Sequence, residues 1–500
     1  MAAVTVAPHP GIVEESNLQE NSSAQRVNGA NGAYQAGVEQ GPDDVIILGG
    51  GVAGLACGLE LARHGWRVTV LEKAGEVGGL ARTVQHAGYR FDIGGHRFHS
   101  HNPRLLRWLQ ELLGAELLRV KRRSHIYLQG QYVRYPLQFP EALRIFGPRQ
   151  LLAVLGSYMA ARWQQRHAAT GPTTFEEWVV RRFGRALFDV YFRPYTEKVW
   201  GIPCHDLSAD WAAQRITLPD LPATIRRALV GGRRPPPTIV SDFYYPQHGF
   251  GMISTRMAEA LLRLGGRIVT GATVNALTPG KDAYSVSYQT QSSSGQVSAP
   301  RVISTIPINA LLRALPSDPL APADVGLDYR DLICIFLIID REQVSRDHWT
   351  YFPQPELIFG RIHEPGNWSK AMTPPGMTSL VAEIFTGREE ETWRMNDEEL
   401  ATTTVGQLQA LGLLTAASVV DWRVLRVRNA YPVYRVGYAG KLRDAQRALQ
   451  HYPRLHLVGR TGAFRYMNSD GVLEDALALV DWLIGQTPRR VDVGARYVVP

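Results

Sequence analysis

The most regular pattern of hydrophobic and polar residues lies near the N-terminus, between Asp43 and Asn102. Two short, continuous apolar runs, Val45–Leu48 and Val68–Leu71, are typical of buried parallel strands. The longer apolar stretch between them, which ends at Gly65, predicts a helix. These segments together predict a strand–helix–strand unit at the start of an α/β fold.

Further along the chain, helical and strand-like patterns alternate in long blocks. Helical spacing dominates from about residue 103 to 218, interrupted by a short sheet segment, IYLQGQYVRYP. Thr173 or Thr174 is the expected N-cap of the helix FEEWVVRRFGRALFDVYF. A loop, a helix and a strand are expected after residue 246, followed by a buried strand in RVISTIP. From Asp331 onwards, β-branched and aromatic runs between turn residues predict antiparallel strands.

Three glycines in GxGxxG spacing join the first strand to the helix. They allow a sharp turn and a close backbone approach to a pyrophosphate, which the free N–H groups of the helix start would bind. Glu72 ends the second strand about 20 residues later, where it would accept hydrogen bonds from ribose hydroxyls. The expected dinucleotide contacts in this unit are Gly49, Gly51, Val52, Ala53, Gly54, Glu72 and Lys73.

The residues that follow distinguish between dinucleotides. EKAGEVGGLAR, with Gly79, Leu80 and Arg82, resembles the second pyrophosphate loop of the amine-oxidase-like flavoproteins, in which the arginine contacts the diphosphate. Enzymes that use NAD do not usually carry this loop. The sequence therefore favours FAD as the cofactor.

These patterns predict an α/β fold in which a Rossmann-type FAD-binding domain is discontinuous and carries a helical insertion and an antiparallel-sheet substrate domain. A disordered leader is expected at 1–42, because it is rich in Ala, Gly, Asn, Gln and Ser without periodicity. The expected divisions of the chain are 43–102, 246–310 and 453–490 for the FAD-binding domain, 103–245 for the helical insertion, 311–452 for the substrate domain and 491–500 for a tail.

Composition narrows the function classes. The net charge is +8 and the pI about 9.4, and 48 of the 54 basic residues are arginine. No basic run is long enough for a nucleic-acid-binding arm, so no nucleic-acid partner is expected, although guanidinium groups suit an anionic substrate. The three cysteines, Cys57, Cys204 and Cys334, are far apart, which favours a cytoplasmic location and argues against a disulfide framework or a metal site. No apolar window reaches about 18 residues, so no membrane span is expected. The oligomeric state stays open.

Several later motifs match one family in order. They are GGHRFHSHN with Gly95 and His96, RPYTEKVWGIP with Tyr195 and Trp200, ADWAAQR with Arg215, FGRIHEP with Arg361, NAYPV with Tyr431, and GRTGAFRYMNSD with Gly459, Arg460, Tyr466 and Asp470. Over about residues 43 to 490 the chain resembles the UDP-galactopyranose mutase family. It departs from the family at Ser469, where the family has methionine before the last acid.

The resemblance implies roles for these residues. His96 would sit on a loop beside the flavin, and Tyr195 and Trp200 would line the sugar-nucleotide site. Arg215 and Arg361 would grip the diphosphate, which Tyr431 would also touch; for Arg361 a cross-strand salt bridge is the alternative role. The last motif would bring Gly459, Arg460, Tyr466 and Asp470 near flavin and substrate. His96, Arg215 and Arg361 are the expected catalytic residues.

The resemblance also implies a reaction. The family interconverts the pyranose and furanose forms of a nucleotide-diphosphate sugar through a flavin N5–sugar adduct, with reduced FAD as the active form and NAD(P)H as the expected reductant. The alternative is an FAD oxidase or dehydrogenase of the amine-oxidase or protoporphyrinogen-oxidase type, which shares EKAGEVGGLAR and the discontinuous cofactor domain. The nucleotide and the sugar are not identified by the sequence.

Overall fold

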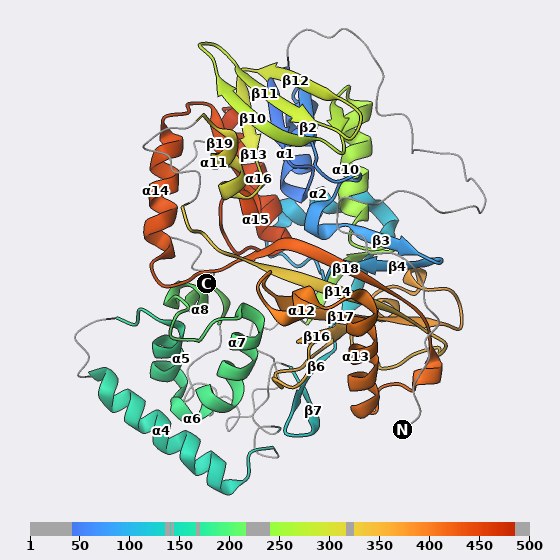
Figure 1. The fold of residues 1–500 in the computed structure, drawn as a ribbon, viewed down its shortest axis with the longest axis vertical. Coiled ribbons are helices and arrows are strands. Elements are labelled where there is room, and N and C mark those ends of the chain that lie inside the picture. The colour runs from blue at the N-terminus through green and yellow to red at the C-terminus, as the bar shows by residue number, and fades with distance from the viewer. Residues whose placement is uncertain are drawn as a thin grey trace.

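The computed structural model describes residues 43–485, apart from 136–140, 142–144, 167–170, 217–240 and 317–324. The expected leader (1–42) and tail (491–500) lie outside the described residues. Two sheets dominate the fold: a parallel sheet at the upper end in Figure 1 and a larger sheet in the lower half, flanked by helices.

The parallel sheet has five strands in the order β19-β13-β1-β2-β9, and all neighbours run parallel. β1 (Val45–Leu48) and β2 (Val68–Leu71) come from the first unit, as predicted. Both are wholly buried because helices or strands cover the two faces of the sheet, so their sequences are continuously apolar. The other three strands come from distant parts of the chain: β9 (Arg267–Val269), β13 (Arg301–Ser304) and β19 (Leu455–Leu457).

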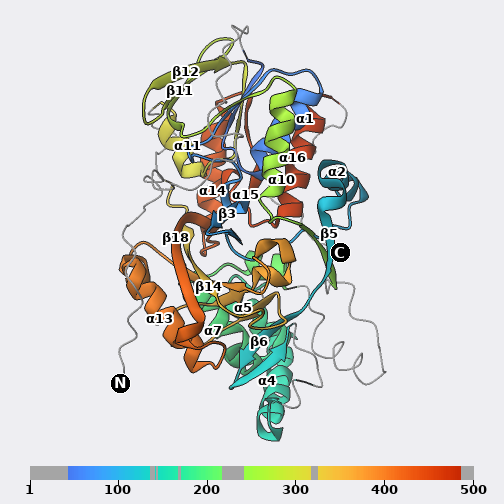
Figure 2. The same cartoon turned by 90° about the vertical axis from the view of Figure 1, so that its right-hand side faces the viewer.

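Helices cover one face of this sheet and a small sheet covers the other (Figures 1 and 2). Ile47 packs with α1 (Val52–Arg63), α10 (Met252–Arg263) and α16 (Ser469–Leu483). Its neighbour Ile46 faces the opposite side, since side chains alternate along a strand, and packs with the small sheet and α11 (Ile308–Ala314).

The small sheet is an antiparallel meander that the sequence analysis did not predict. Its strands are β10 (Thr273–Pro279), β11 (Tyr284–Gln289) and β12 (Ser294–Ala299). In β11 the buried side chains alternate with half-buried serines, so one face packs inward and the other faces solvent.

The larger sheet has seven strands in the order β18-β14-β17-β16-β15-β6-β7. All neighbours are antiparallel except β6 and β15, which run parallel. β18 was not predicted, because its arginines and aspartate interrupt the apolar pattern. The strands are β6 (Ser124–Leu128), β7 (Gln131–Arg134), β14 (Tyr329–Ile339), β15 (Trp349–Tyr351), β16 (Arg361–His363), β17 (Thr378–Thr386) and β18 (Val419–Pro432).

Helices lie at the lower left of this sheet in Figure 1. Thr174 caps α5, where its side chain accepts from the Glu177 N–H and Glu177 reaches back in a capping box, so this part of the N-cap prediction is confirmed. The helices of this region are α4 (Pro148–Arg166), α5 (Phe175–Phe183), α6 (Arg185–Leu187), α7 (Arg193–Trp200) and α8 (Ala209–Arg215).

The remaining elements link the two sheets or extend them. Two antiparallel strand pairs are formed by β3 (Thr83–His86) with β4 (Tyr89–Asp92), which is a hairpin, and by β5 (Leu117–Lys121) with β8 (Asp242–Pro246), which are far apart in the sequence. The further helices are α2 (Pro103–Leu113), α12 (Glu391–Arg394), α13 (Asp397–Ala410), α14 (Tyr438–Gln450) and α15 (Gly459–Gly462).

Candidate active site

The first glycine loop is packed tightly on one side and open on the other. Gly49 has a φ of +102°, which favours glycine. A Cβ on Gly54 would lie 2.0 Å from the Gly49 carbonyl oxygen, whereas a Cβ on Gly51 would meet nothing within 4 Å. The start of α1 can therefore press against β1 while the turn keeps free space beside Gly51, as a bound phosphate requires.

The second glycine loop lies directly against the first. The Gly78 N–H donates to the Gly50 carbonyl at 2.8 Å, and a Cβ on Gly79 would lie 3.4 Å from the Gly51 Cα. Arg82 follows, and its buried Nε makes no hydrogen bond among the described residues but lies 3.4 Å from the carboxylate of the exposed Glu76. A buried guanidinium with only this loose ion pair fits a diphosphate oxygen.

Glu72 stabilises the first glycine loop. Its carboxylate accepts the Gly50 N–H at 2.6 Å and the Ala74 N–H at 2.8 Å, and the side chain is buried. It therefore ties the end of β2 to the glycine turn at the position where a ribose would bind. Lys73 is exposed and Leu80 half-buried.

The C-terminal segment closes over the start of α1. Gly459 has a φ of +81°, and a Cβ there would lie 2.7 Å from the Ala53 Cβ, so only glycine fits this contact. The Gly459 N–H donates to Asp475 at 3.0 Å, which ties the turn to α16. Val52 and Ala53 are buried beneath it, so three segments far apart in the sequence meet at the loop.

Arg460, next in the chain, lies over two tyrosines. Its guanidinium carbon is 4.5 Å from the ring centroids of both Tyr431 and Tyr466, which stack 6.1 Å apart at 15°. Its Nε and Nη2 are buried and have no hydrogen-bond partner within the described part of the chain. The arginine is thus held by aromatic rings while two of its N–H-bearing atoms remain available to an acceptor.

Trp200 completes this aromatic cluster. It is 2% exposed and makes edge contacts with Trp211, Tyr431 and Tyr466 at 5.2, 6.3 and 6.0 Å. The structure therefore brings together α7, the end of β18 and the segment after α15. In the present conformation the indole is packed beneath the tyrosines and does not form an open surface.

Arg361 lies in a buried ion pair. It stands opposite Glu383 in the β16–β17 ladder, and its Nε and Nη2 both contact the carboxylate, the first at 2.7 Å. Burial alone raises the pKa of Glu383, but Arg361 and His363 outweigh burial and lower it to about 2. The cross-strand salt bridge is therefore present, and it engages Nε and Nη2 of Arg361.

The predicted histidine loop connects to this pair. The Gly95 N–H donates to the Glu383 carboxylate at 3.2 Å, and His96 Nδ1 lies 3.1 Å from the Gly94 carbonyl oxygen. Burial, together with the positive charge of Arg460, lowers the pKa of His96 to about 4. His96 is therefore neutral at pH 7, and its ring stacks on Phe250 at 5.2 Å.

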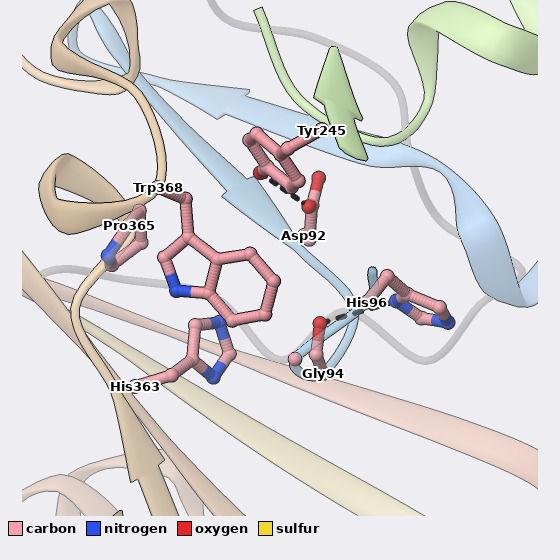
Figure 3. Close-up of a pocket in the computed structure, with 8 residues that line it drawn as sticks. Asp92, Gly94, His96, Tyr245, His363, Pro365 and Trp368 are labelled. Carbon is pink, nitrogen blue, oxygen red and sulfur yellow. Dashed lines mark hydrogen bonds between the residues drawn. The ribbon is translucent and has the colours of Figure 1, made fainter. Parts of the chain in front are cut away.

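A small pocket lies behind the histidine loop (Figure 3). Asp92 accepts hydrogen bonds there from the Tyr245 hydroxyl at 2.6 Å and from the Phe250 N–H at 3.0 Å, while burial raises its pKa. His363 Nε2 is buried with no hydrogen-bond partner among the described residues. The pocket is lined by Asp92, Gly94, Gly95, His96, Tyr245, His363, Pro365 and Trp368.

The residues behind the histidine loop were not predicted from the sequence. Asp92 stands two residues before GGH and His363 two residues after Arg361, so the flanks of the recognised motifs carried a signal. Tyr245 and Glu383 carried none, because their partners are far away in the sequence. Lys198 was also missed: it donates to the carbonyls of Phe352 and Gln354, and burial lowers its pKa to about 7.

The remaining predicted residues lie as follows. Tyr195 packs edge-on against Tyr351 at 5.4 Å, and Asp470 stands in the first turn of α16. Burial raises the pKa of Tyr195 and of Tyr431, while the charge of Arg361 opposes this in both. Arg215 is the last residue of α8, and its side chain lies outside the described residues, so its role stays a prediction.

The donors present fit a flavin dinucleotide. The free space at Gly51, the N-terminus of the buried α1 and the N–H groups of Arg82 and Arg460 that make no hydrogen bond among the described residues are what its diphosphate and polar groups need. Across the described ranges no group of three or more His, Cys, Asp or Glu is arranged to hold a metal ion. The three cysteines are unbridged and buried, and no described helix has the length and apolarity to cross a membrane.

Comparison with known proteins identifies similar sequences. The probable UDP-galactopyranose mutase of Klebsiella pneumoniae is 24% identical over 173 residues, which is 33% of this chain and 43% of that protein. Amine oxidase [flavin-containing] A of Equus caballus is 36% identical over 101 residues, which is 19% of each chain. The chain thus spans less than half the length of these curated relatives.

Solved structures match almost the whole fold. A crystal structure of reduced UDP-galactopyranose mutase has a TM-score of 0.79 at 24% identity, over 90% of this chain and 97% of that chain. A putative protoporphyrinogen oxidase from Exiguobacterium sp. 255-15 has a TM-score of 0.68 at 17% identity, over 89% and 99%. The predicted fold class is confirmed, and the resemblance to the mutases holds at the level of the fold.

The profile of one family extends over most of the chain. The sequence model of the family described as "Flavin containing amine oxidoreductase" matches residues 52–477, from the first turn of α1 into α16. This range includes the second glycine loop, the seven-stranded sheet, the strands of the parallel sheet other than β1, and Arg460. The expectation of a flavin cofactor agrees with it. The chain therefore belongs to the family of flavin-containing amine oxidoreductases.

Proposed function

We propose that this protein is an FAD-dependent mutase that interconverts the pyranose and furanose forms of a nucleotide-diphosphate sugar, UDP-galactose or a related sugar. One observation carries the proposal: the rings of Tyr431 and Tyr466 contact both Trp200 and Arg460. Burial raises the pKa of Tyr431, and Arg361 is close enough for its positive charge to oppose this rise. Aromatic faces and a charged guanidinium group are what a sugar diphosphate needs for binding.

Different residues of the chain would bind the diphosphate and the sugar of the substrate. Arg361, oriented by Glu383, would present its Nη1 side to the diphosphate as it leaves and returns, with the Tyr431 hydroxyl beside it. Burial and Glu383 have opposing effects on Arg361, and the carboxylate prevails, so the guanidinium stays charged. Tyr195 would line the sugar side. Arg215 is proposed as the second diphosphate arginine from its sequence motif.

The cofactor would bind along the glycine loops. Gly51, Gly79 and Arg82 would hold its diphosphate, and Arg460 and the His96 loop would lie beside its ring. When bound and reduced, the flavin would supply the nucleophile, N5, that displaces the diphosphate from the sugar. His96 is neutral at pH 7 and would orient the loop; it would not act as a proton donor. NAD(P)H is the proposed reductant and the cytoplasm the proposed location.

The test is an anaerobic assay of product. The purified protein would be reduced with dithionite, incubated with UDP-galactofuranose and analysed by chromatography. We expect UDP-galactopyranose to form with reduced flavin and not with oxidised flavin. Arg361→Leu should abolish this activity, while Arg394→Leu, at an exposed position, should not affect it. Binding of UDP without turnover would redirect the search to other nucleotide sugars, and absence of any binding would refute the proposal.

A second candidate function rests on the matched family and on the similarity to a putative protoporphyrinogen oxidase. An oxidase or dehydrogenase would transfer electrons from substrate to flavin, so its substrate would bleach the flavin absorbance under anaerobic conditions. A mutase leaves the oxidation state of the flavin unchanged over a turnover. Bleaching by an amine or a porphyrinogen would therefore favour the oxidase.

A further inference from the structure

Helix α4 carries large apolar side chains on its solvent-facing side. Leu152, Leu155, Met159 and Trp163 are 69%, 44%, 67% and 67% exposed. Their spacing of three, four and four residues places them in one stripe along the helix. We call these four residues the α4 stripe. The helix lies at the lower edge of the molecule in Figures 1 and 2, at the opposite end from the five-stranded sheet.

The opposite face of α4 is the one that holds it to the protein. Tyr158 and Ala161 are buried there, and the Ser157 hydroxyl accepts the Ala186 N–H at 3.2 Å. A Cβ on Gly184 would lie 2.6 Å from that hydroxyl oxygen, so the helix is seated closely on the α5–α6 junction. The helix is therefore attached through this face, and α4 is apolar on two opposite faces.

The charges around the stripe have one sign. Arg149 and Arg162 are exposed and lie on its two borders, one on each side at helical periodicity. Neither forms an ion pair within the described ranges, and α4 contains no aspartate or glutamate. An apolar stripe of Leu, Met and Trp bordered by arginines is the pattern of a helix that lies in the interface of a bilayer.

A second copy of this chain fits the stripe less well. Packing α4 on another α4 would bring the bordering arginines together with no acid in either helix to pair with them. Four partly exposed side chains also supply on the order of a few hundred Å², below the roughly 800 Å² per partner of a stable interface. An anionic lipid surface meets both the apolar stripe and the arginines.

We propose that the α4 stripe, with Arg149 and Arg162, docks this protein on the surface of an anionic membrane. The helix would lie parallel to the surface, with the four side chains at the boundary of head groups and acyl chains and the arginines at the lipid phosphates. No residue of this contact belongs to the candidate active site, so docking does not depend on the proposed function.

The test is co-sedimentation of the full-length flavoprotein with vesicles. We expect binding to vesicles of phosphatidylglycerol and phosphatidylcholine, weak binding to phosphatidylcholine alone, and release by salt. Leu152→Asp/Met159→Asp should weaken binding at least tenfold, and Arg149→Glu/Arg162→Glu should remove the preference for anionic lipid. Val420→Asp/Val436→Asp, at 55% and 49% exposure outside α4, is the matched control and should bind normally.

Thermal unfolding and flavin content show whether each variant is folded, and the replaced side chains are exposed, so little change is expected. Absence of wild-type binding to anionic vesicles, or equal binding by the stripe variant and the control, would overturn the proposal. So would a dimer in light scattering that the stripe variant converts to a monomer, if vesicles do not bind, because the stripe would then serve a second copy.

Discussion

The two ends of the candidate site are built in different ways. At the cofactor end, residues close together in the sequence form the turn, on which the segment of Gly459 packs, and glycine is required where a Cβ would overlap the backbone, as at Gly54. At the aromatic end, Trp200, Tyr431 and Arg460 come from segments far apart, and long-range contacts alone hold them together. Backbone shape thus specifies the first end and side-chain pairing the second. Substitutions should affect the two ends differently.

The largest change in unfolding free energy is expected on substitution of Glu383, which binds Arg361 and the histidine loop next to the aromatic cluster. Glu383→Ala leaves the buried Arg361 without its carboxylate and the Gly95 N–H without its acceptor. Breaking a buried pair in this way costs about 3–5 kcal/mol of unfolding free energy. Denaturant unfolding would measure it. The matched control is Glu389→Ala, which breaks an exposed pair with Arg394 and should change stability by less than about 1 kcal/mol. Equal effects of the two variants would contradict the ion-pair interpretation.

At the cofactor end, two glycine-to-alanine variants distinguish the effect of backbone packing on stability from the effect of free space on flavin binding. Gly54→Ala places a Cβ against the Gly49 carbonyl and should destabilise the protein by about 2–3 kcal/mol. Gly51→Ala meets open space, so the fold should hold while flavin binding is lost. Flavin absorbance per protein and the unfolding midpoint distinguish the two outcomes. Normal flavin content in Gly51→Ala would mean that the phosphate lies elsewhere.

Arg460 lies between the two ends of the site, and its Nε and Nη2 have no hydrogen-bond acceptor within the described residues. Arg460→Leu removes no protein hydrogen bond from those two atoms but loses the contacts with the rings of Tyr431 and Tyr466, so the unfolding free energy of the flavin-free protein should fall by only about 1–2 kcal/mol. Flavin affinity should fall about 10- to 100-fold, as for loss of a charged hydrogen bond. Titration with FAD measures this. A large loss of stability with unchanged affinity would make Arg460 a structural residue.

The smallest expected effect is the decrease in unfolding free energy at acidic pH that His96 causes. The folded pKa of His96 is about 4, below its ordinary value of 6.5, so the unfolded chain binds more protons between these values. The unfolding free energy should therefore fall as pH drops from 6.5 to 4, by about 1–2 kcal/mol after allowance for partial exposure. His96→Asn should flatten this part of the stability profile. The contribution of Glu383 is lost below pH 4.5, as pH falls toward about 2. An unchanged slope in His96→Asn would refute this assignment.

The sequence predicted the cofactor end better than the aromatic end, for a physical reason. β1, α1 and β2 follow from local periodicity and glycine spacing, and the Thr174 cap from one residue and its neighbours. The Arg361–Glu383 pair depends on the register of β16 with β17, which no local pattern encodes. β18 and the β10–β12 meander were missed because charged or small residues interrupt their apolar pattern.

The arginines illustrate the limit of motif reasoning. A motif identified Arg361 as a ligand residue and left a salt bridge as the alternative; the structure contains the salt bridge, and the ligand role remains a proposal. The functional importance of Arg460 is suggested by its missing acceptor, which only three-dimensional packing reveals. The division of the chain into domains and the role of Arg215 also remain predictions.

The most direct test is a crystal structure of the reduced protein with bound UDP. Our account predicts the flavin diphosphate beside Gly51 and Arg82, and the UDP diphosphate within hydrogen-bond distance of the Arg361 guanidinium and the Tyr431 hydroxyl, with Arg460 between the two ligands. UDP bound at a place that contacts neither Arg361 nor Tyr431, or a flavin ring remote from His96 and Arg460, would contradict the account.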